Sequence, residues 1–208
     1  MTFYENGKKN GFEYFYYKEG GIKIIIEYKN SVQENQEFHY YKNGKKKAVI
    51  NYKNGQKNGR MESWYENGEL LGIADFIDDH HSGTSYAWYK NGKIKAIGNF
   101  KNGVQDGVET QYFDNGNIKV SCNFINGLPD GIEKQYYYDG SLKIQAEFVN
   151  GQLNGYEKTW YKNHQLRSKI FYINGTKTTE VLFWDKYGNL AETLNDWDDF
   201  FRKKTFEH

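Results

Sequence analysis

Glycine recurs in this chain at a fixed interval of 24 residues, and this period constrains the fold more than any other feature of the sequence. One series opens six of the eight repeats: Gly11, Gly59, Gly83, Gly107, Gly131 and Gly155. The other two repeats open at Asn35 and Thr179. Two further series follow Asn or Asp in most repeats: Gly20, Gly44, Gly68, Gly92, Gly116, Gly140 and Gly188, and Gly7, Gly55, Gly103, Gly127, Gly151 and Gly175. A period of roughly 20 to 50 residues is typical of a repeat array, in which each unit packs on its neighbours. We therefore expect one array over residues 1–190, without a linker between domains.

Between the turns of each repeat, apolar or small residues alternate with polar ones, as in Ile94, Ala96, Gly98 and Phe100. A period of two residues indicates β-strands. Asn-Gly is the strongest short hairpin signal, because both turn residues accept positive φ. The chain is rich in strand-forming aromatics, with 19 Tyr, 14 Phe and 5 Trp, and has one proline. We predict an all-β protein: an elongated single antiparallel sheet of about eight successive hairpins, not closed into a barrel.

The strand pattern stops near the C-terminus. Leu194, Trp197 and Phe201 fall at helical spacing, and acidic residues within 196–199 precede basic residues at 202–204. This order of charges suits the helix dipole, because acids are favourable near the N-terminus of a helix and bases near its C-terminus. We predict a capping helix over residues 191–204, followed by a tail to residue 208, because repeat arrays need a polar cap for solubility.

Position six of each repeat, counted from the residue that opens it, is always aromatic. We call these residues the aromatic ladder: Tyr16, Tyr40, Trp64, Trp88, Tyr112, Tyr136, Trp160 and Trp184. Position seven is aromatic in every repeat but the last, where Asp185 stands. Neighbouring strand residues point to opposite faces, so one of these two columns should be partly exposed. A row of Tyr and Trp suits recognition of another protein. The alternative is that the rings only cover one another and the sheet.

Position thirteen of most repeats is basic. We call this set the basic column: Lys23, Lys47, Lys95, Lys119, Lys143 and Arg167, with Leu71 and Ala191 interrupting it. A solvated face is one interpretation, because like charges about 10 Å apart repel only weakly in salt. Contact with an acidic partner or with anionic lipid head groups is the other. Glutamates at position three form the counterpart of the column: Glu13, Glu37, Glu109, Glu133 and Glu157.

Composition excludes several classes of protein and site. The net charge of +1, from 28 basic and 27 acidic residues, argues against a nucleic-acid binder, which needs a basic surface. Cys122 is the one cysteine, so the chain forms no internal disulfide and no cysteine-based zinc site. Three other repeats place the small residues Ala74, Gly98 and Ala146 at its position, which predicts a small packing residue. No apolar run is long enough for a membrane-spanning helix.

The third repeat departs from the pattern, because Asp78-Asp79-His80-His81 replaces its second Asn-Gly turn. Carboxylates and imidazoles are metal ligands, but their spacing here matches no compact site. We expect a solvated loop or a bulge that bends the array, and no metal site. No catalytic grouping and no cofactor-binding loop emerge elsewhere, so we expect no enzyme and no cofactor.

The opening glycine, the glutamate two residues later, the aromatic pair and the two Asn-Gly turns together resemble the MORN repeat in its bacterial variant form. The resemblance covers residue 4 to about residue 190, although these repeats are one residue longer than the usual MORN unit. It implies a sheet of hairpins with a grooved, aromatic-lined face, and a scaffold that binds a partner protein or lipid. For some bacterial relatives, of the YwqK type, it implies an antitoxin role; others resemble exported repeat proteins.

We therefore predict a non-enzymatic scaffold that binds another protein through the aromatic ladder. Because Tyr4–Gly7 matches the middle of a repeat, we expect a targeting segment upstream of Met1, and we favour export or the bacterial cell envelope over the cytoplasm. Two alternatives stay open. One is a cytoplasmic antitoxin that covers the working surface of a toxin, and the other is peripheral binding of anionic lipid by the basic column.

Overall fold

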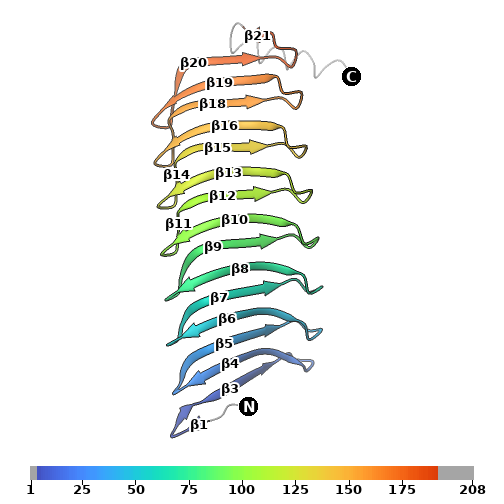
Figure 1. The fold of residues 1–208 in the computed structure, drawn as a ribbon, viewed down its shortest axis with the longest axis vertical. Coiled ribbons are helices and arrows are strands. Elements are labelled where there is room, and N and C mark those ends of the chain that lie inside the picture. The colour runs from blue at the N-terminus through green and yellow to red at the C-terminus, as the bar shows by residue number, and fades with distance from the viewer. Residues whose placement is uncertain (1–3, 192–208) are drawn as a thin grey trace. The chain divides into compact units, whose positions relative to one another are not determined.

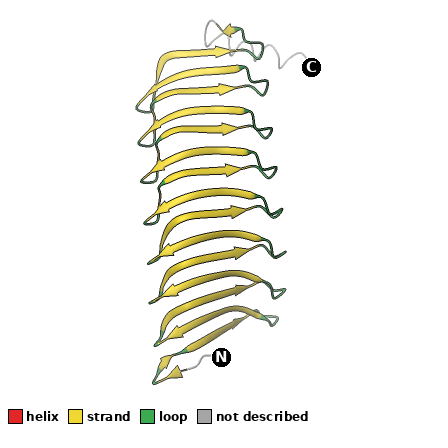
Figure 2. Ribbon diagram, in the orientation of Figure 1, coloured by secondary structure: helices red, strands yellow, loops and turns green. Residues whose placement is uncertain are grey.

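A computed structural model describes residues 4–191, which form β-strands joined by short turns (Figures 1 and 2). No helix occurs within residues 4–191. The predicted capping helix falls outside the described residues, apart from residue 191, which is in a strand. The chain divides into two compact units: the first contains the residues to Gly107 together with 114–116, and the second contains 108–113 and the residues from Asn117 onward.

The first unit contains eleven of the strands. They are β1 (Tyr4–Glu5), β2 (Lys8–Lys9), β3 (Gly11–Tyr16), β4 (Ile22–Lys29), β5 (Val32–Tyr40), β6 (Lys46–Lys53), β7 (Gln56–Trp64), β8 (Leu70–Ile77), β9 (His80–Trp88), β10 (Ile94–Lys101) and β11 (Val104–Gln105). The second strand of each hairpin begins 24 residues after the one before it, at Ile22, Lys46, Leu70 and Ile94.

The second unit repeats this arrangement, again with eight-residue second strands in β13, β16 and β19. They are β12 (Gly107–Tyr112), β13 (Ile118–Ile125), β14 (Leu128–Pro129), β15 (Gly131–Tyr136), β16 (Leu142–Val149), β17 (Gln152–Leu153), β18 (Gly155–Trp160), β19 (Leu166–Ile173), β20 (Thr176–Trp184) and β21 (Leu190–Ala191). β14 and β15 correspond to one long strand interrupted at Asp130, and β17 and β18 to one interrupted at Asn154.

Every strand pairing within the units is antiparallel and joins neighbouring strands of the chain, except that β13 also pairs with β15 and β16 with β18, across the short strands β14 and β17. β7 pairs with β8, and β6 pairs with β7, so each hairpin also lies beside the hairpin before it (Figure 1). Among the described residues of either unit, no register pairs its first strand with its last. The prediction of an all-β antiparallel sheet of successive hairpins is confirmed.

The two turns of each repeat differ in length and in backbone conformation. In the first turn, Tyr89 N–H donates to the Lys93 carbonyl and Gly92 N–H to the Tyr89 carbonyl, both at 2.9 Å, which leaves three residues in the loop. Only Gly92 has positive φ there, at 78°. In the second turn, both Asn102 and Gly103 have positive φ, at 51° and 81°. The first turn is thus a three-residue hairpin loop and the second a two-residue one.

The register sorts side chains onto two faces. On the first, which we call the small-residue face, Glu37 pairs with Ile50 and His39 with Ala48. Ala48 and Ile50, with Cys122, Ala146 and Ile170 in the second unit, are the most buried apolar residues of the described chain. Larger rings cover them, as where Phe100 Cε2 would lie 3.3 Å from a Cβ added at Gly98. Small residues here let the rings pack close to the strands.

Candidate functional site

The aromatic ladder occupies one structural position in every repeat. Each of its residues is the last residue of its strand: Tyr16, Tyr40, Trp64, Trp88, Tyr112, Tyr136, Trp160 and Trp184 end β3, β5, β7, β9, β12, β15, β18 and β20. Tyr40 pairs with Lys46, so both side chains lie on the face opposite the small-residue face, which we call the aromatic face. Tyr16 is 57% exposed, and the other seven are half-buried.

The tyrosines at position seven of the repeat hold the backbone carbonyls of the aromatic ladder by hydrogen bonds. The hydroxyl of Tyr41 donates a 2.8 Å hydrogen bond to the carbonyl of Trp64, and Tyr65 makes the same bond to Trp88. In the second unit, Tyr137 donates to Trp160 at 2.8 Å. Each tyrosine therefore ties its own repeat to the next. The sequence contained the signal for these bonds, because a phenol recurring at one position needs a polar partner when it is partly buried.

The basic column stacks on these same tyrosines. The Nζ atoms of Lys47 and Lys95 lie 5.7 and 5.8 Å from the ring centroids of Tyr41 and Tyr89. Lys23, Lys143 and Arg167 make the equivalent contacts in their own repeats. Lys119, like the other lysines of the column, is exposed. The column is therefore ordered by cation–π contacts while its charges stay accessible to solvent.

A shallow groove opens on the aromatic face of the first unit. It has a volume of about 390 Å³ and is lined by Lys45, Lys46, Trp64 and Gly68. Lys45 and Lys46 belong to the hairpin that precedes the one carrying Trp64 and Gly68. The groove therefore lies between two successive repeats and includes one member of the aromatic ladder.

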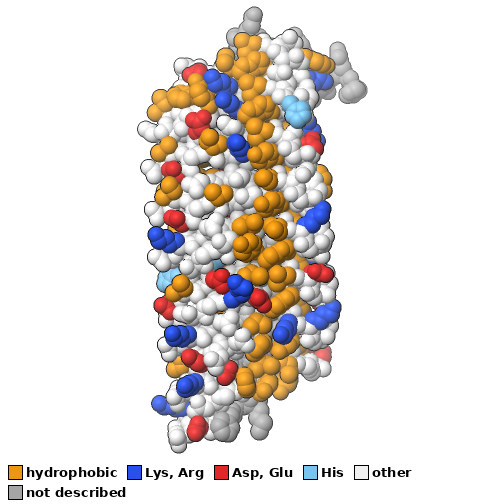
Figure 3. Space-filling view, in the orientation of Figure 1, with side chains coloured by type: hydrophobic (Ala, Val, Ile, Leu, Met, Phe, Trp, Pro, Cys, Tyr) orange, Lys and Arg blue, Asp and Glu red, His pale blue; other side chains and the backbone are white. Residues whose placement is uncertain are grey.

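Hydrophobic side chains gather in a stripe across the strands of each unit (Figure 3). Tyr86 and Trp88 contribute to such a surface on β9, where their rings stack with centroids 5.8 Å apart, and Tyr86 is 37% exposed. An exposed apolar stripe of this kind marks an interaction surface more often than an enzyme site.

The glutamates at position three lie on the small-residue face, as where Glu37 pairs with Ile50. Burial raises the pKa of Glu37, but hydrogen bonds from His39 Nε2 and Gln33 Nε2 to its carboxylate outweigh burial, so the pKa is lowered. Burial and the charge of Glu37 raise the pKa of Tyr52 to about 12. Burial raises the pKa of Glu157, and Lys177 only partly opposes it.

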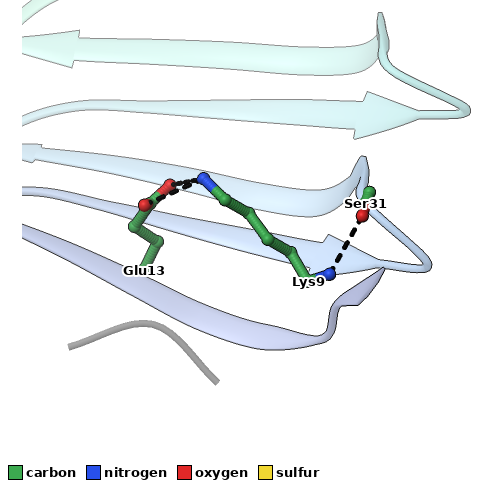
Figure 4. A network of polar contacts seen from close by, with 3 residues as sticks. All are labelled: Lys9, Glu13 and Ser31. Carbon is green, nitrogen blue, oxygen red and sulfur yellow. Dashed lines mark hydrogen bonds and ion pairs between the residues drawn. The ribbon is translucent and has the colours of Figure 1, made fainter. Parts of the chain in front are cut away.

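The first repeat holds a comparable network (Figure 4). Lys9 Nζ donates to both carboxylate oxygens of Glu13 at 2.9 Å, and the backbone N–H of Lys9 donates to Ser31 Oγ at 2.9 Å. The hydrogen bond with Glu13 raises the pKa of Lys9. The network joins β2, β3 and the turn after β4, so its groups serve structure and leave no free amine for chemistry.

The Asp78–His81 segment is an exposed hairpin turn, as the solvated-loop interpretation expected, and forms no bulge, because Ile77 pairs directly with His80. Asp78 and Asp79 have positive φ and replace Asn-Gly in an ordinary second turn, while β9 begins at His80. Asp79 Oδ1 accepts the backbone N–H of Lys57 at 2.8 Å. The ring of His81 stacks on Phe100, with centroids 3.8 Å apart. These side chains are therefore engaged in turn formation and packing.

The described residues give little support for a reactive cysteine, a metal site or a membrane-spanning helix. Cys122 is 3% exposed, and burial raises the pKa of its thiol to about 11, so it is a neutral packing residue near neutral pH. Between residues 4 and 191, no three His, Cys, Asp or Glu side chains are grouped as metal ligands would be. The same stretch contains no helix with the length and apolar character needed to cross a membrane.

Comparison with known proteins agrees with this geometry. Six segments match the MORN repeat variant: residues 33–54, 57–78, 82–102, 105–126, 129–150 and 153–174. Together they cover more than half of the 208 residues. No curated protein matches the chain. Each matched segment spans most of one hairpin: its first strand, the first turn and its second strand. The chain therefore belongs to the MORN repeat variant family, whose repeats generally serve protein or lipid interaction as a non-catalytic scaffold.

Proposed function

We propose that this protein is a non-enzymatic scaffold that binds another protein through its aromatic face. The observation that carries the proposal is the aromatic ladder. Within each unit its residues end the first strand of successive hairpins on the aromatic face, seven of the eight are half-buried, and none is fully covered. Half-exposed Tyr and Trp offer large contact areas at a low cost in conformational entropy, which is why they are frequent in binding sites.

The hydrogen bonds beneath the ladder support the same conclusion. Because Tyr41 and Tyr65 fix the carbonyls of Trp64 and Trp88, the ladder keeps its spacing before a partner arrives. A surface ordered in advance loses less entropy on binding. An antitoxin would be one instance of this function, with a toxin as the partner, and export to the cell envelope would decide which partners the scaffold meets.

Site-specific photo-crosslinking tests the proposal. A photoreactive phenylalanine at position 88 lies on the aromatic face, and one at position 101 lies at the far end of β10, where Lys101 is exposed. We expect position 88 to form an adduct with one protein of the native host, identified by mass spectrometry, and position 101 to form none with it. Equal labelling of the same proteins from both positions would contradict the proposal.

Vesicle sedimentation tests the lipid alternative. The exposed lysines of the basic column would face the membrane, so Lys95→Glu, Lys119→Glu and Lys143→Glu together would abolish binding to phosphatidylserine vesicles. Binding that is strong in the unmodified protein and lost in the triple variant would favour lipid over protein as the ligand. Binding that is absent, or unaffected by the reversal, excludes the basic column as a lipid site.

A further inference from the structure

The groove of the first unit contains a charge where the repeat pattern calls for an aliphatic side chain. Position twelve is Ile or Leu in the other seven repeats: Ile22, Leu70, Ile94, Ile118, Leu142, Leu166 and Leu190. The second repeat has Lys46 there, at the start of β6. A local violation of an otherwise regular pattern is where function is expected, because it lowers stability without a structural benefit.

The ammonium of Lys46 has no partner within the described residues. Between residues 4 and 191, it takes part in no hydrogen bond, ion pair or ring contact, and its side chain is exposed. Its neighbours differ. Lys45 Nζ donates to the Asn67 carbonyl at 2.8 Å, and Lys47 Nζ stacks over Tyr41 at 5.7 Å. Of three consecutive lysines, two are committed to structure, and Lys46 alone is available to a ligand.

The rest of the groove supplies an apolar wall in a fixed position. Trp64 lies half-buried at the end of β7, and its carbonyl is held by the hydroxyl of Tyr41. Gly68 forms the next turn, and a Cβ added to it would lie 3.9 Å from Lys45 Nζ. The absence of a side chain at Gly68 therefore keeps the groove open beside the lysines.

We propose that this groove binds an acidic segment of the partner protein, with a carboxylate at Lys46 and an adjacent aromatic side chain against Trp64. The proposal rests on the proposed function and deepens it by assigning the chemistry of the partner. Charge complementarity carries it, because the three lysines at 45–47 gather positive charge at one end of β6, and Lys46 has no counter-ion in the described chain. The apolar wall selects a peptide over a simple anion.

The test is an NMR titration of the intact, ¹⁵N-labelled protein with an acidic peptide, Gly-Glu-Phe-Glu-Phe-Glu-Gly, and with its analogue that has glutamine at each glutamate. We expect the acidic peptide to shift the indole N–H resonance of Trp64 and the amide of Lys46 more than the indole of Trp160, because the repeat before Trp160 has Leu142 at position twelve where the repeat before Trp64 has Lys46. The glutamine analogue should bind more weakly. The indole N–H resonance of Trp64 is assigned as the one that disappears in the Trp64→Phe variant.

Two leucine variants distinguish binding in the groove from a general attraction of the acidic peptide to positive charge. Lys46→Leu restores the residue type of the other repeats, and Lys47→Leu copies Leu71 of the third repeat, so both should fold. Each variant removes one positive charge, but of these two lysines Lys46 lines the groove and Lys47 does not. We expect Lys46→Leu to raise the Kd for the acidic peptide about fivefold, as for one partly exposed ion pair, and Lys47→Leu to change it by less than about twofold.

Equal weakening by the two variants, or equal binding of the glutamine analogue, would overturn the proposal. Binding of phosphatidylserine vesicles with no response to the peptide would also overturn it, in favour of a lipid surface. These failures are distinguishable from failure of the proposed function, because the photo-crosslinking at position 88 reports a protein partner whether or not the groove takes part.

Discussion

Replacement of Gly92 by valine should destabilise the protein through backbone strain alone. Gly92 closes the first turn of its repeat with φ of 78°, and a Cβ added there would meet no heavy atom within 4 Å. No clash therefore contributes to the cost. A β-branched residue in this left-handed region costs about 1–2 kcal/mol relative to glycine. For a chain of this size, that corresponds to a fall in Tm of roughly 2–8 °C.

The structure supplies a graded control for this prediction. His164 occupies the same turn position in its own repeat with φ of 67°, and its N–H still donates to the Tyr161 carbonyl at 3.0 Å. Asn and His tolerate this region better than valine does. We therefore expect Gly92→Asn and Gly92→His to lower Tm less than Gly92→Val.

Differential scanning calorimetry of the three variants measures these shifts under one set of conditions. If Gly92→Val leaves Tm unchanged, the assignment of the turn is wrong. If Gly92→Asn costs as much as Gly92→Val, the cost arises from contacts of the side chain and not from φ.

The other predictions concern the polar columns. Tyr41→Phe removes the hydrogen bond to the Trp64 carbonyl and should lower the free energy of unfolding by about 1 kcal/mol, measured by urea denaturation. The carboxyl ¹³C resonance of Glu37 should titrate below the ordinary glutamate pKa, and that of Glu157 above it. Glu37 therefore contributes stability that is present above its unfolded-state pKa and is lost as pH falls through the lower folded-state value. The effect of Glu157 on stability depends on pH in the opposite direction. Its contribution to stability is present below its unfolded-state pKa and is lost as pH rises through its higher folded-state pKa.

A specific result would contradict each of these two predictions. An unchanged urea midpoint for Tyr41→Phe would mean that the bond adds nothing over water at that carbonyl. The pH prediction is tested by comparing the stability of Glu37→Gln with that of Glu157→Gln. At neutral pH, Glu37→Gln should lower the free energy of unfolding and Glu157→Gln should not. The reverse order would show that the hydrogen bonds from His39 and Gln33 do not outweigh burial at Glu37.

Much of the fold could be predicted from the sequence because hairpins depend on local chemistry. The Asn102-Gly103 pair specifies a two-residue turn by its own φ preferences, and the alternation from Ile94 to Phe100 specifies a strand. The aromatic ladder and the basic column were found as columns for the same reason. Their roles as binding residues stay predictions, and so does the division of the chain at residue 190.

The contacts between columns could not be predicted, because they depend on register. The pairing of β9 with β10 shifts between Ile94 and Ala96, and the loop of the first turn has three residues, a length that the sequence did not decide. Such shifts decide which side chains face each other across the strands. No sequence pattern placed Glu37 on either face, and the register puts it opposite Ile50.

The sequence by itself determined the repeat, the turns and the strand type of this protein, since each follows from the conformational preferences of a few neighbouring residues. Only the tertiary structure decided that Tyr41 bonds Trp64 from the next repeat, that Glu37 is half-buried, and that Lys46 is left beside an open groove. The physical reason is that these properties arise between hairpins, where register and the stacking of successive repeats set distance, burial and charge together.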